Sequence, residues 1–87
     1  MDRYLVCPVD IFDLEQKIYL VTNNETKLIK KTPVYDITDA IINSCMHYGI
    51  ENVYLQGLEE YLKELEEEIY KSASVDYNYN KIKVHIV

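Results

Sequence analysis

Glycine is scarce in this 87-residue chain, which contains two glycines, two prolines, two cysteines and no tryptophan. The shortage excludes a glycine-rich phosphate-binding loop, because such loops need several glycines to bring backbone N–H groups close to a phosphate. Cys7 and Cys45 lack the Cys-x-x-Cys spacing of metal and redox sites, so we expect two buried, reduced thiols. No serine or cysteine lies in a nucleophile-elbow pattern. We therefore expect no catalytic residue and no cofactor.

Long apolar runs are also absent. No stretch approaches about 18 consecutive apolar residues, the length that a membrane-spanning helix needs. The first residues show no basic segment followed by an apolar run, so no signal peptide is predicted and a cytoplasmic location is expected. Positive charge is in deficit, with 15 acidic against nine basic residues and a net charge of -6. This balance argues against nucleic-acid or anionic-membrane binding by the whole surface and favours a basic partner.

Four segments have the composition and alternation of β-strands, and a fifth closes the chain. The first is apolar enough to be buried on both faces, although Pro8 requires a bulge or irregularity because it cannot donate a ladder hydrogen bond. Asn23 and Asn24 tolerate left-handed backbone angles and indicate a hairpin loop. The five predicted strands are Tyr4–Ile11, Lys17–Thr22, Lys27–Thr32, Asn52–Gly57 and Lys81–Val87.

Two segments have helical periodicity. One helix face is predicted between Asp36, a predicted N-cap, and Gly49, a predicted left-handed C-cap. Its residues recur at i, i+4, i+7, i+8 and i+11, namely Ile37, Ile41, Ser44, Cys45 and Tyr48. The same spacing recurs from Leu58 to about Ala73. One α/β domain over residues 1–87 follows, with element order βββαβαβ. Right-handed crossovers then give a five-stranded mixed sheet, spatial order 3-2-1-4-5, with two helices packed on it.

Lysines support this strand order. Lys27, Lys30 and Lys31 lie on the third strand, and Lys81 and Lys83 on the fifth. These two strands would form the sheet edges, which need charged side chains to discourage pairing with other chains. A homodimer joined through an edge strand is nevertheless one possible assembly.

The element order resembles a minimal ribonuclease-H-like fold over nearly the whole chain. Catalytic members of that superfamily bind divalent metal with acids on the first strand, the first helix and the end of the fourth strand. Asp10 matches the first position and Asp39 loosely the second, whereas the fourth strand ends in Gln56 and Gly57. The resemblance therefore implies the fold, and a metal-dependent nuclease or nucleotide-binding domain is the alternative function. The short, acidic, Lys-, Ile-, Tyr- and Asn-rich chain also resembles small bacteriophage proteins.

Asp10 and Asp13 are the candidate metal ligands, near the carboxyl ends of the first and fourth predicted strands. Open α/β sheets bind ligands at such ends. Two carboxylates can hold a divalent ion only if further oxygen ligands complete the shell. The competing interpretation is that both aspartates start a turn.

The second predicted helix carries six glutamates and one internal lysine between Leu58 and Ile69. Glu59 with Lys63 and Glu67 with Lys71 form favourable i, i+4 pairs, whereas Glu60 and Glu64 repel by roughly 0.2–0.5 kcal/mol. This face is either simply solvated or a docking surface for a basic protein. The predicted partner-binding residues are Glu60, Glu64, Glu67, Glu68, Tyr70, Tyr77 and Tyr79.

The preferred hypothesis is thus a non-enzymatic interaction protein that binds a basic protein surface. For a phage protein, this partner would be a nucleic-acid-binding or defence protein of the host, with the acidic helix acting as inhibitor or nucleic-acid mimic.

Overall fold

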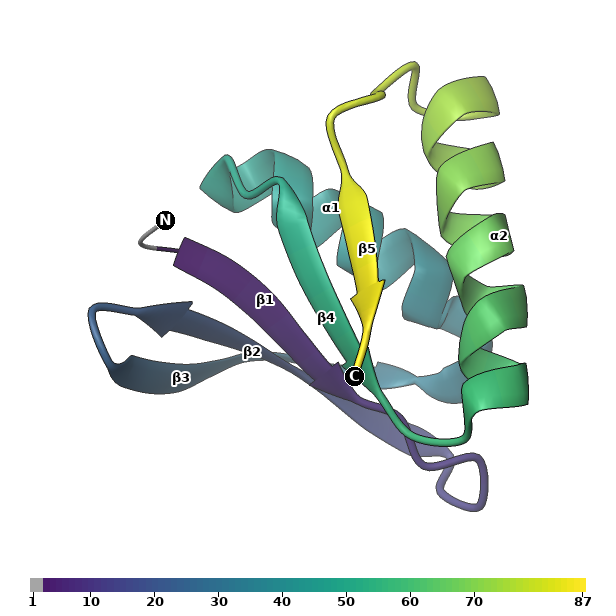
Figure 1. The fold of residues 1–87 in the computed structure, drawn as a ribbon, viewed down its shortest axis with the longest axis horizontal. Coiled ribbons are helices and arrows are strands. Elements are labelled where there is room, and N and C mark those ends of the chain that lie inside the picture. The colour runs from purple at the N-terminus through teal and green to yellow at the C-terminus, as the bar shows by residue number, and fades with distance from the viewer. Residues whose placement is uncertain (1–2) are drawn as a thin grey trace.

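A computed structural model describes residues 3–87 as one sheet with two helices (Figure 1). The strands are β1 (Arg3–Pro8), β2 (Glu15–Thr22), β3 (Glu25–Pro33), β4 (Asn52–Gln56) and β5 (Lys83–Ile86). The helices are α1 (Ile37–Tyr48), preceded by a 3-10 turn (Val34–Asp36), and α2 (Glu59–Val75). The strand order is β3-β2-β1-β4-β5, with β1, β4 and β5 parallel and both β1–β2 and β2–β3 antiparallel. The predicted α/β fold class and strand order are confirmed.

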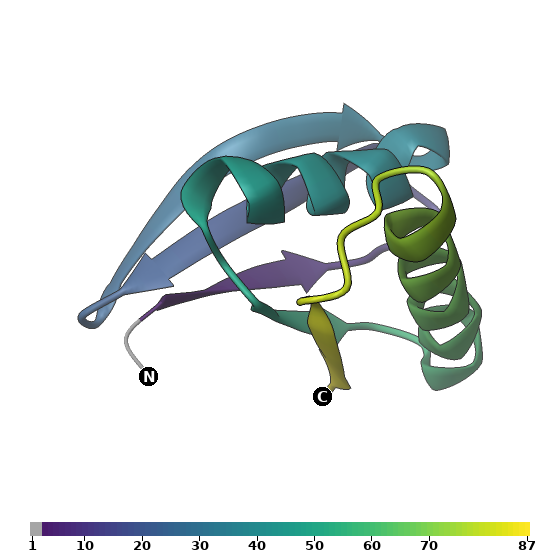
Figure 2. The same ribbon diagram turned by 90° about the horizontal axis from the view of Figure 1, so that it is seen from above.

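Both helices lie on the same side of the sheet, and no described element covers the other side of β1, β4 and β5 (Figure 2). The two crossovers, β3 to β4 and β4 to β5, move in the same direction across the sheet. Right-handed connections of that kind place both helices on one face. The core lies between this face and the helices, and its fully buried side chains include Leu5, Ile18, Ile41, Val53, Leu55, Leu62 and Ile69.

The predicted first strand, Tyr4–Ile11, is too long and is not buried on both faces. β1 ends at Pro8, and residues 9–14 form a loop. Leu5 and Cys7 are fully buried under the helices, whereas Tyr4 and Val6 are half-buried on the opposite face. Pro8 needs no bulge, because pairing with β2 ends at Val6 and Pro8 occupies the last position of the strand.

The β2–β3 hairpin extends in both directions beyond the prediction. β2 begins at Glu15, and β3 begins at Glu25 directly after a two-residue turn. Asn23 and Asn24 have φ angles of 46° and 69°, which confirms the left-handed turn. The irregularity expected at Pro8 occurs instead in this hairpin, where the register shifts between Ile18 and Tyr19.

The helix limits match the prediction closely. Gly49 adopts φ 66° at the end of α1, and the buried Ile50 follows it. Asp36 occupies the N-cap position but its side chain makes no capping hydrogen bond. α2 extends two residues beyond Ala73, and β5 is shorter than the predicted Lys81–Val87. No helix within residues 3–87 is both long and apolar enough to cross a membrane.

Candidate interaction surface

The loop between β1 and β2 is organised by a buried glutamine. The Gln16 side chain is 1% exposed, and its Nε2 donates hydrogen bonds at 2.7 Å to the carbonyl oxygens of Asp10 and Asp13. Its Oε1 accepts a hydrogen bond from the backbone N–H of Asp10 at 3.0 Å. A side-chain amide that satisfies three backbone groups holds the loop in one conformation. The loop is therefore a fixed platform for the side chains it presents.

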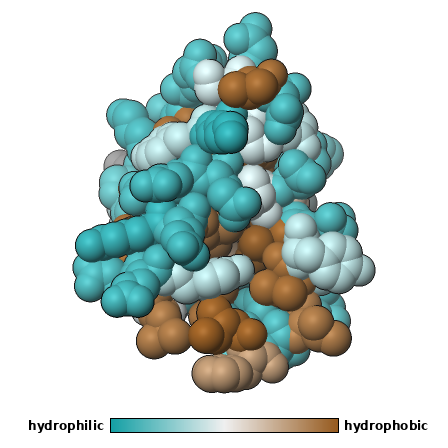
Figure 3. Space-filling view, turned by 90° about the vertical axis from the view of Figure 1, so that its right-hand side faces the viewer, coloured by the Kyte–Doolittle hydropathy of each residue, from teal (hydrophilic) through white to brown (hydrophobic). Residues whose placement is uncertain are grey.

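Those side chains are apolar and exposed. Phe12 is 89% exposed and Leu14 75%, and Ile11 in the same loop is 40% exposed. Leu58, at the start of α2, is 58% exposed. We call these four residues the apolar tip. Figure 3 shows apolar side chains gathered at the lower end of the face formed by α2 and this loop. Large apolar groups clustered on a rigid surface are characteristic of protein-binding sites.

The outer side of α2 begins next to the apolar tip and carries the predicted glutamates. Glu60, Glu64 and Glu68 follow one another at intervals of four residues, with Glu67 beside them, and all four are exposed. We call these four residues the acidic face. It lies opposite the buried side of the helix, which carries Leu62, Leu65, Ile69 and Ala73. Hydrophilic side chains cover most of the upper part of this view, with an apolar group near its top (Figure 3).

Few cations neutralise the acidic face. Of the two predicted pairs, Lys63 Nζ lies 3.7 Å from Glu59 Oε2, whereas no ion pair forms between Glu67 and Lys71. Within residues 3–87 no ion pair involves Glu60, Glu64, Glu67 or Glu68. A shallow depression of about 520 Å³ joins the acidic face to the apolar tip and is lined by Ile11, Leu58, Glu59, Glu60, Tyr61 and Glu64.

The three predicted tyrosine anchors make contacts within the chain, two through their hydroxyl groups and one by packing. The Tyr70 hydroxyl accepts a hydrogen bond from the backbone N–H of Val84 at 2.8 Å, which ties α2 to β5. The Tyr77 hydroxyl donates to Asp39 Oδ1 at 3.2 Å, and burial together with that carboxylate raises the Tyr77 pKa. Tyr79 packs against the core, and burial raises its pKa as well. All three tyrosines fasten the end of α2 and the segment that follows it.

The predicted metal ligands serve as turn residues. Asp10 Oδ1 accepts the backbone N–H of Phe12, and Asp13 Oδ1 accepts that of Glu15, each at 3.0 Å. Both are Asx turns, in which an aspartate side chain replaces a backbone acceptor. Among residues 3–87, no group of three His, Cys, Asp or Glu side chains is placed to hold a metal ion. The site geometry thus favours the interpretation of Asp10 and Asp13 as turn formers.

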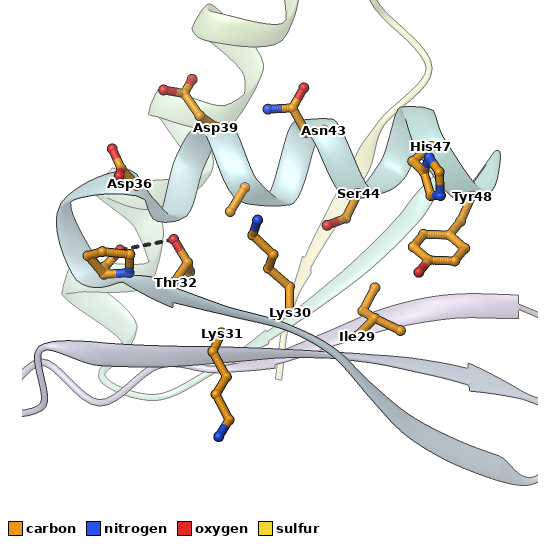
Figure 4. Close-up of a pocket in the computed structure, with 12 residues that line it drawn as sticks. Ile29, Lys30, Lys31, Thr32, Asp36, Asp39, Asn43, Ser44, His47 and Tyr48 are labelled. Atoms are coloured by element: carbon orange, nitrogen blue, oxygen red, sulfur yellow. Dashed lines mark hydrogen bonds between the residues drawn. The ribbon is translucent and has the colours of Figure 1, made fainter.

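A second concavity, of about 620 Å³, lies between β3 and α1 (Figure 4). Asp36, Asp39, Asn43 and His47 line it from one side of α1, and Lys30 points into it from β3. Asp36 and His47 are 11 residues apart, which is roughly 16 Å along a helix. The polar groups of this concavity are therefore spread along the helix and do not converge on one point. Asp39, the second residue suggested by the ribonuclease-H-like resemblance, lines this groove and bonds to Tyr77.

The sequence contains a signal for the apolar tip that the predicted elements do not use. The predicted first strand includes Ile11, and the polar neighbours of Leu14 predict an ordinary turn. An apolar pair, Ile11 and Phe12, followed by Leu14 within a turn-forming segment is the pattern that reveals the tip. The buried role of Gln16 carries no sequence signal, because glutamine is usually exposed.

Comparison with known proteins finds no matching family model and no matching curated protein. Among solved structures, the fold is similar to that of a protein from Bacteroides thetaiotaomicron VPI-5482 with an actin-like ATPase fold and unknown function. The TM-score is 0.70 at 13% sequence identity, and the match covers 99% of this chain and 32% of that one. At this identity the similarity shows the fold alone, and it supports the expected resemblance to the ribonuclease-H-like fold. The chain spans about a third of the length of that protein.

Proposed function

We propose that this protein is an interaction module that binds a basic protein through the apolar tip and the acidic face together. The observation that carries the proposal is their adjacency. Ile11 and Leu58 line one depression together with Glu60 and Glu64. Phe12 and Leu14, 89% and 75% exposed, lie on the same loop as Ile11, which Gln16 fixes. Apolar anchors supply most of the binding energy in protein interfaces, and surrounding charges select the partner and accelerate its approach.

Charge supports the choice of partner. Glu60, Glu64 and Glu68 lie at successive i, i+4 positions, each adjacent pair destabilising the helix by roughly 0.2–0.5 kcal/mol. No ion pair within residues 3–87 compensates them. A basic surface would remove this repulsion, so it is the complement that the helix lacks. The partner surface would present Lys or Arg around an apolar pocket that receives Phe12.

A finer form of the proposal concerns the origin of the chain. If it is phage-encoded, the partner is a nucleic-acid-binding or defence protein of the host, whose basic surface the acidic face occupies as a nucleic-acid mimic. The row of glutamates on α2 supports this form, because a nucleic-acid-binding surface is rich in Lys and Arg.

Affinity capture from a host-type lysate tests the proposal, with bound proteins identified by mass spectrometry. Two variants alter the site, Phe12→Ser with Leu14→Ser in the apolar tip and Glu60→Lys with Glu64→Lys in the acidic face. A third variant, Glu25→Lys with Glu51→Lys, makes the same charge change at exposed positions that belong to neither the apolar tip nor the acidic face. We expect the wild type and the third variant to capture the same basic protein and both site variants to lose it.

Salt and folding provide the controls. Capture by the wild type should weaken between 50 and 300 mM salt, about the range in which the Debye length falls below 10 Å. Circular dichroism must show that all variants are folded. A partner that both site variants retain would contradict the proposal, as would a wild type that captures no protein in excess of the site variants.

A further inference from the structure

The side of the sheet that faces away from α1 and α2, here called the open face, forms a regular grid. Strand register aligns a central row of its side chains across all five strands, with shorter runs of paired residues on either side of that row. The central row is Leu28, Tyr19, Val6, Tyr54 and His85. On one side of it lie Lys31, Lys17, Pro8 and Gln56, and on the other Thr26, Val21, Tyr4, Asn52 and Lys83.

The central row is apolar and aromatic although no described element covers it. Leu28 is 40% exposed, and Tyr19, Val6 and Tyr54 are half-buried. The Tyr54 ring stacks on His85 at a centroid distance of 4.5 Å, and Tyr4 meets Tyr54 edge-on at 5.1 Å. A shallow depression of about 410 Å³ lies over this part of the sheet and is lined by Tyr4, Val6, Pro8, Tyr19, Val21, Thr26 and Gln56.

Such a face normally lies against another layer. Parallel strands usually have both sides covered, and their sequences are then apolar throughout. β1 has this character in Tyr4–Cys7, yet the structure covers only Leu5 and Cys7. The mismatch between a strand composed for burial on both sides and a sheet covered on one side is the first observation that favours a partner on the open face.

Charge identifies the kind of partner. The strand residues of the open face include three lysines, Lys17, Lys31 and Lys83, and one glutamate, Glu15, at the start of β2. Lys17 and Lys31 lie directly opposite each other across the β2–β3 ladder, an unfavourable like-charge pair. Figure 4 shows Lys31 directed away from α1, on the side opposite to Lys30. The open face is thus positively charged in a protein of net charge -6.

We propose that the open face binds an amphipathic helix of another protein whose apolar stripe is flanked by acidic residues. The central row spans five strands, about 19 Å at roughly 4.8 Å per strand, which gives room for about 13 helical residues. The apolar stripe contacts Tyr19, Val6 and Tyr54. The acidic flanks meet Lys17 and Lys31 at one corner and Lys83 at the diagonal corner. This surface is separate from the apolar tip and the acidic face.

Other occupants fit less well. Two open faces packed on each other would bring their apolar rows together. They would also bring the lysines of both copies close to one another, and these positive charges would repel. Single-stranded nucleic acid would find lysines and aromatic rings, but the Tyr54 ring already stacks on His85, and the net charge of -6 repels a polyanion. An acidic amphipathic helix satisfies both the apolar row and the lysines.

A displayed library of 18-residue helical peptides tests the proposal. Apolar residues occupy i, i+3, i+4 and i+7 in every member, and the flanking positions are random. We expect selection on the full chain to enrich Asp and Glu at the flanks. In fluorescence anisotropy, Lys17→Glu with Lys31→Glu should weaken the best peptide at least tenfold. The matched control, Lys27→Glu with Lys30→Glu on the opposite side of β3, should change its Kd less than twofold.

Three results would overturn the proposal. The first is selection without enrichment of acidic flanks, or with no enriched peptide. The second is binding that Lys17→Glu with Lys31→Glu leaves unchanged while circular dichroism shows that the variant is folded. The third is an open face occupied by another molecule. Amide shifts of Tyr54 and His85 on adding a 12-nucleotide oligothymidine would show binding of nucleic acid, and concentration-dependent shifts of the same amides with self-association in sedimentation would show a second copy of the chain. Substitution of Phe12 and Leu14 should not affect the peptide, which separates this site from the apolar tip.

Discussion

Gln16 and Asp10 form a reciprocal pair in the β1–β2 loop. Gln16 Nε2 donates to the Asp10 carbonyl oxygen at 2.7 Å, and the Asp10 backbone N–H donates to Gln16 Oε1 at 3.0 Å. A side chain thereby provides the two hydrogen bonds that a neighbouring strand would otherwise supply. The pair explains how a six-residue loop can keep large apolar side chains exposed in a defined arrangement.

Gln16→Ala should lower the free energy of unfolding by about 2–3 kcal/mol, because it leaves buried backbone groups of Asp10 and Asp13 without partners. Urea denaturation followed by circular dichroism measures the change. Glu15→Gln, at the exposed neighbouring position, is the control and should stay within about 0.5 kcal/mol. Equal stability of Gln16→Ala and wild type would show that water replaces the amide and that the loop does not depend on it.

Phe12→Ala should leave stability within about 0.5 kcal/mol of wild type, because the ring is 89% exposed and buries little apolar area on folding. Affinity for the partner should fall by at least about tenfold, as for an aromatic anchor at an interface. Titration of the captured partner measures the loss. Tyr35→Ala, which removes another exposed ring, is the comparison. Loss of stability instead of affinity would make Phe12 part of the core rather than of a binding site.

The topology was predictable because its determinants are local and redundant. Helical spacing, the left-handed cap at Gly49 and the asparagine turn each depend on a few neighbouring residues, and right-handed crossovers leave one strand order. The end of β1 was not predictable in the same way. Val9 and Ile11 continue the apolar pattern beyond Pro8, whereas the Asx turns of Asp10 and Asp13 and the contacts of Gln16 make that segment a loop.

The candidate site was predictable in part. Charge on α2 is visible in the sequence because helical periodicity alone places Glu60 and Glu64 opposite the core. The roles of Tyr70 and Tyr77 were not visible, because each hydroxyl meets a group 14 or more residues away along the chain. Periodicity determines which way a side chain points, whereas tertiary packing determines what it meets.

Gly57→Ala should destabilise the protein by about 2–3 kcal/mol. Gly57 has φ 146°, and an added Cβ would lie 2.6 Å from the Val9 carbonyl oxygen, which is backbone and cannot turn aside. Gly49→Ala is the matched control, with φ 66° and no atom within 4 Å of its added Cβ, so it should cost only about 1 kcal/mol. Urea denaturation of both variants gives the comparison. A smaller loss at Gly57 than at Gly49 would mean that β1 and β4 separate easily at this point.

Tyr70→Phe should lower stability by about 1–2 kcal/mol, because it removes the hydroxyl that accepts the Val84 N–H. β5 is an edge strand, and this bond from α2 covers part of its free side. Hydrogen exchange of the Val84 amide should accelerate more than that of other β5 amides. Tyr35→Phe, at a ring 79% exposed, should change neither quantity. Unchanged exchange at Val84 would indicate that the hydroxyl does not protect the edge.

Alkaline pH should destabilise the protein through its two buried thiols. Burial raises the pKa of Cys7 and of Cys45 to about 12 from 9.0, because the thiolate is poorly solvated in the core. Because each thiol has a higher pKa in the folded than in the unfolded protein, the contribution of the protonated thiols to stability is fully present below about pH 9. It is then lost as the pH rises toward 12, at up to about 1.4 kcal/mol per pH unit for each thiol. Urea denaturation between pH 8 and 11 measures the slope. Cys45→Ala should reduce it, whereas an unchanged slope would assign the alkaline loss to other groups, such as Tyr77 and Tyr79, whose pKa values are also raised.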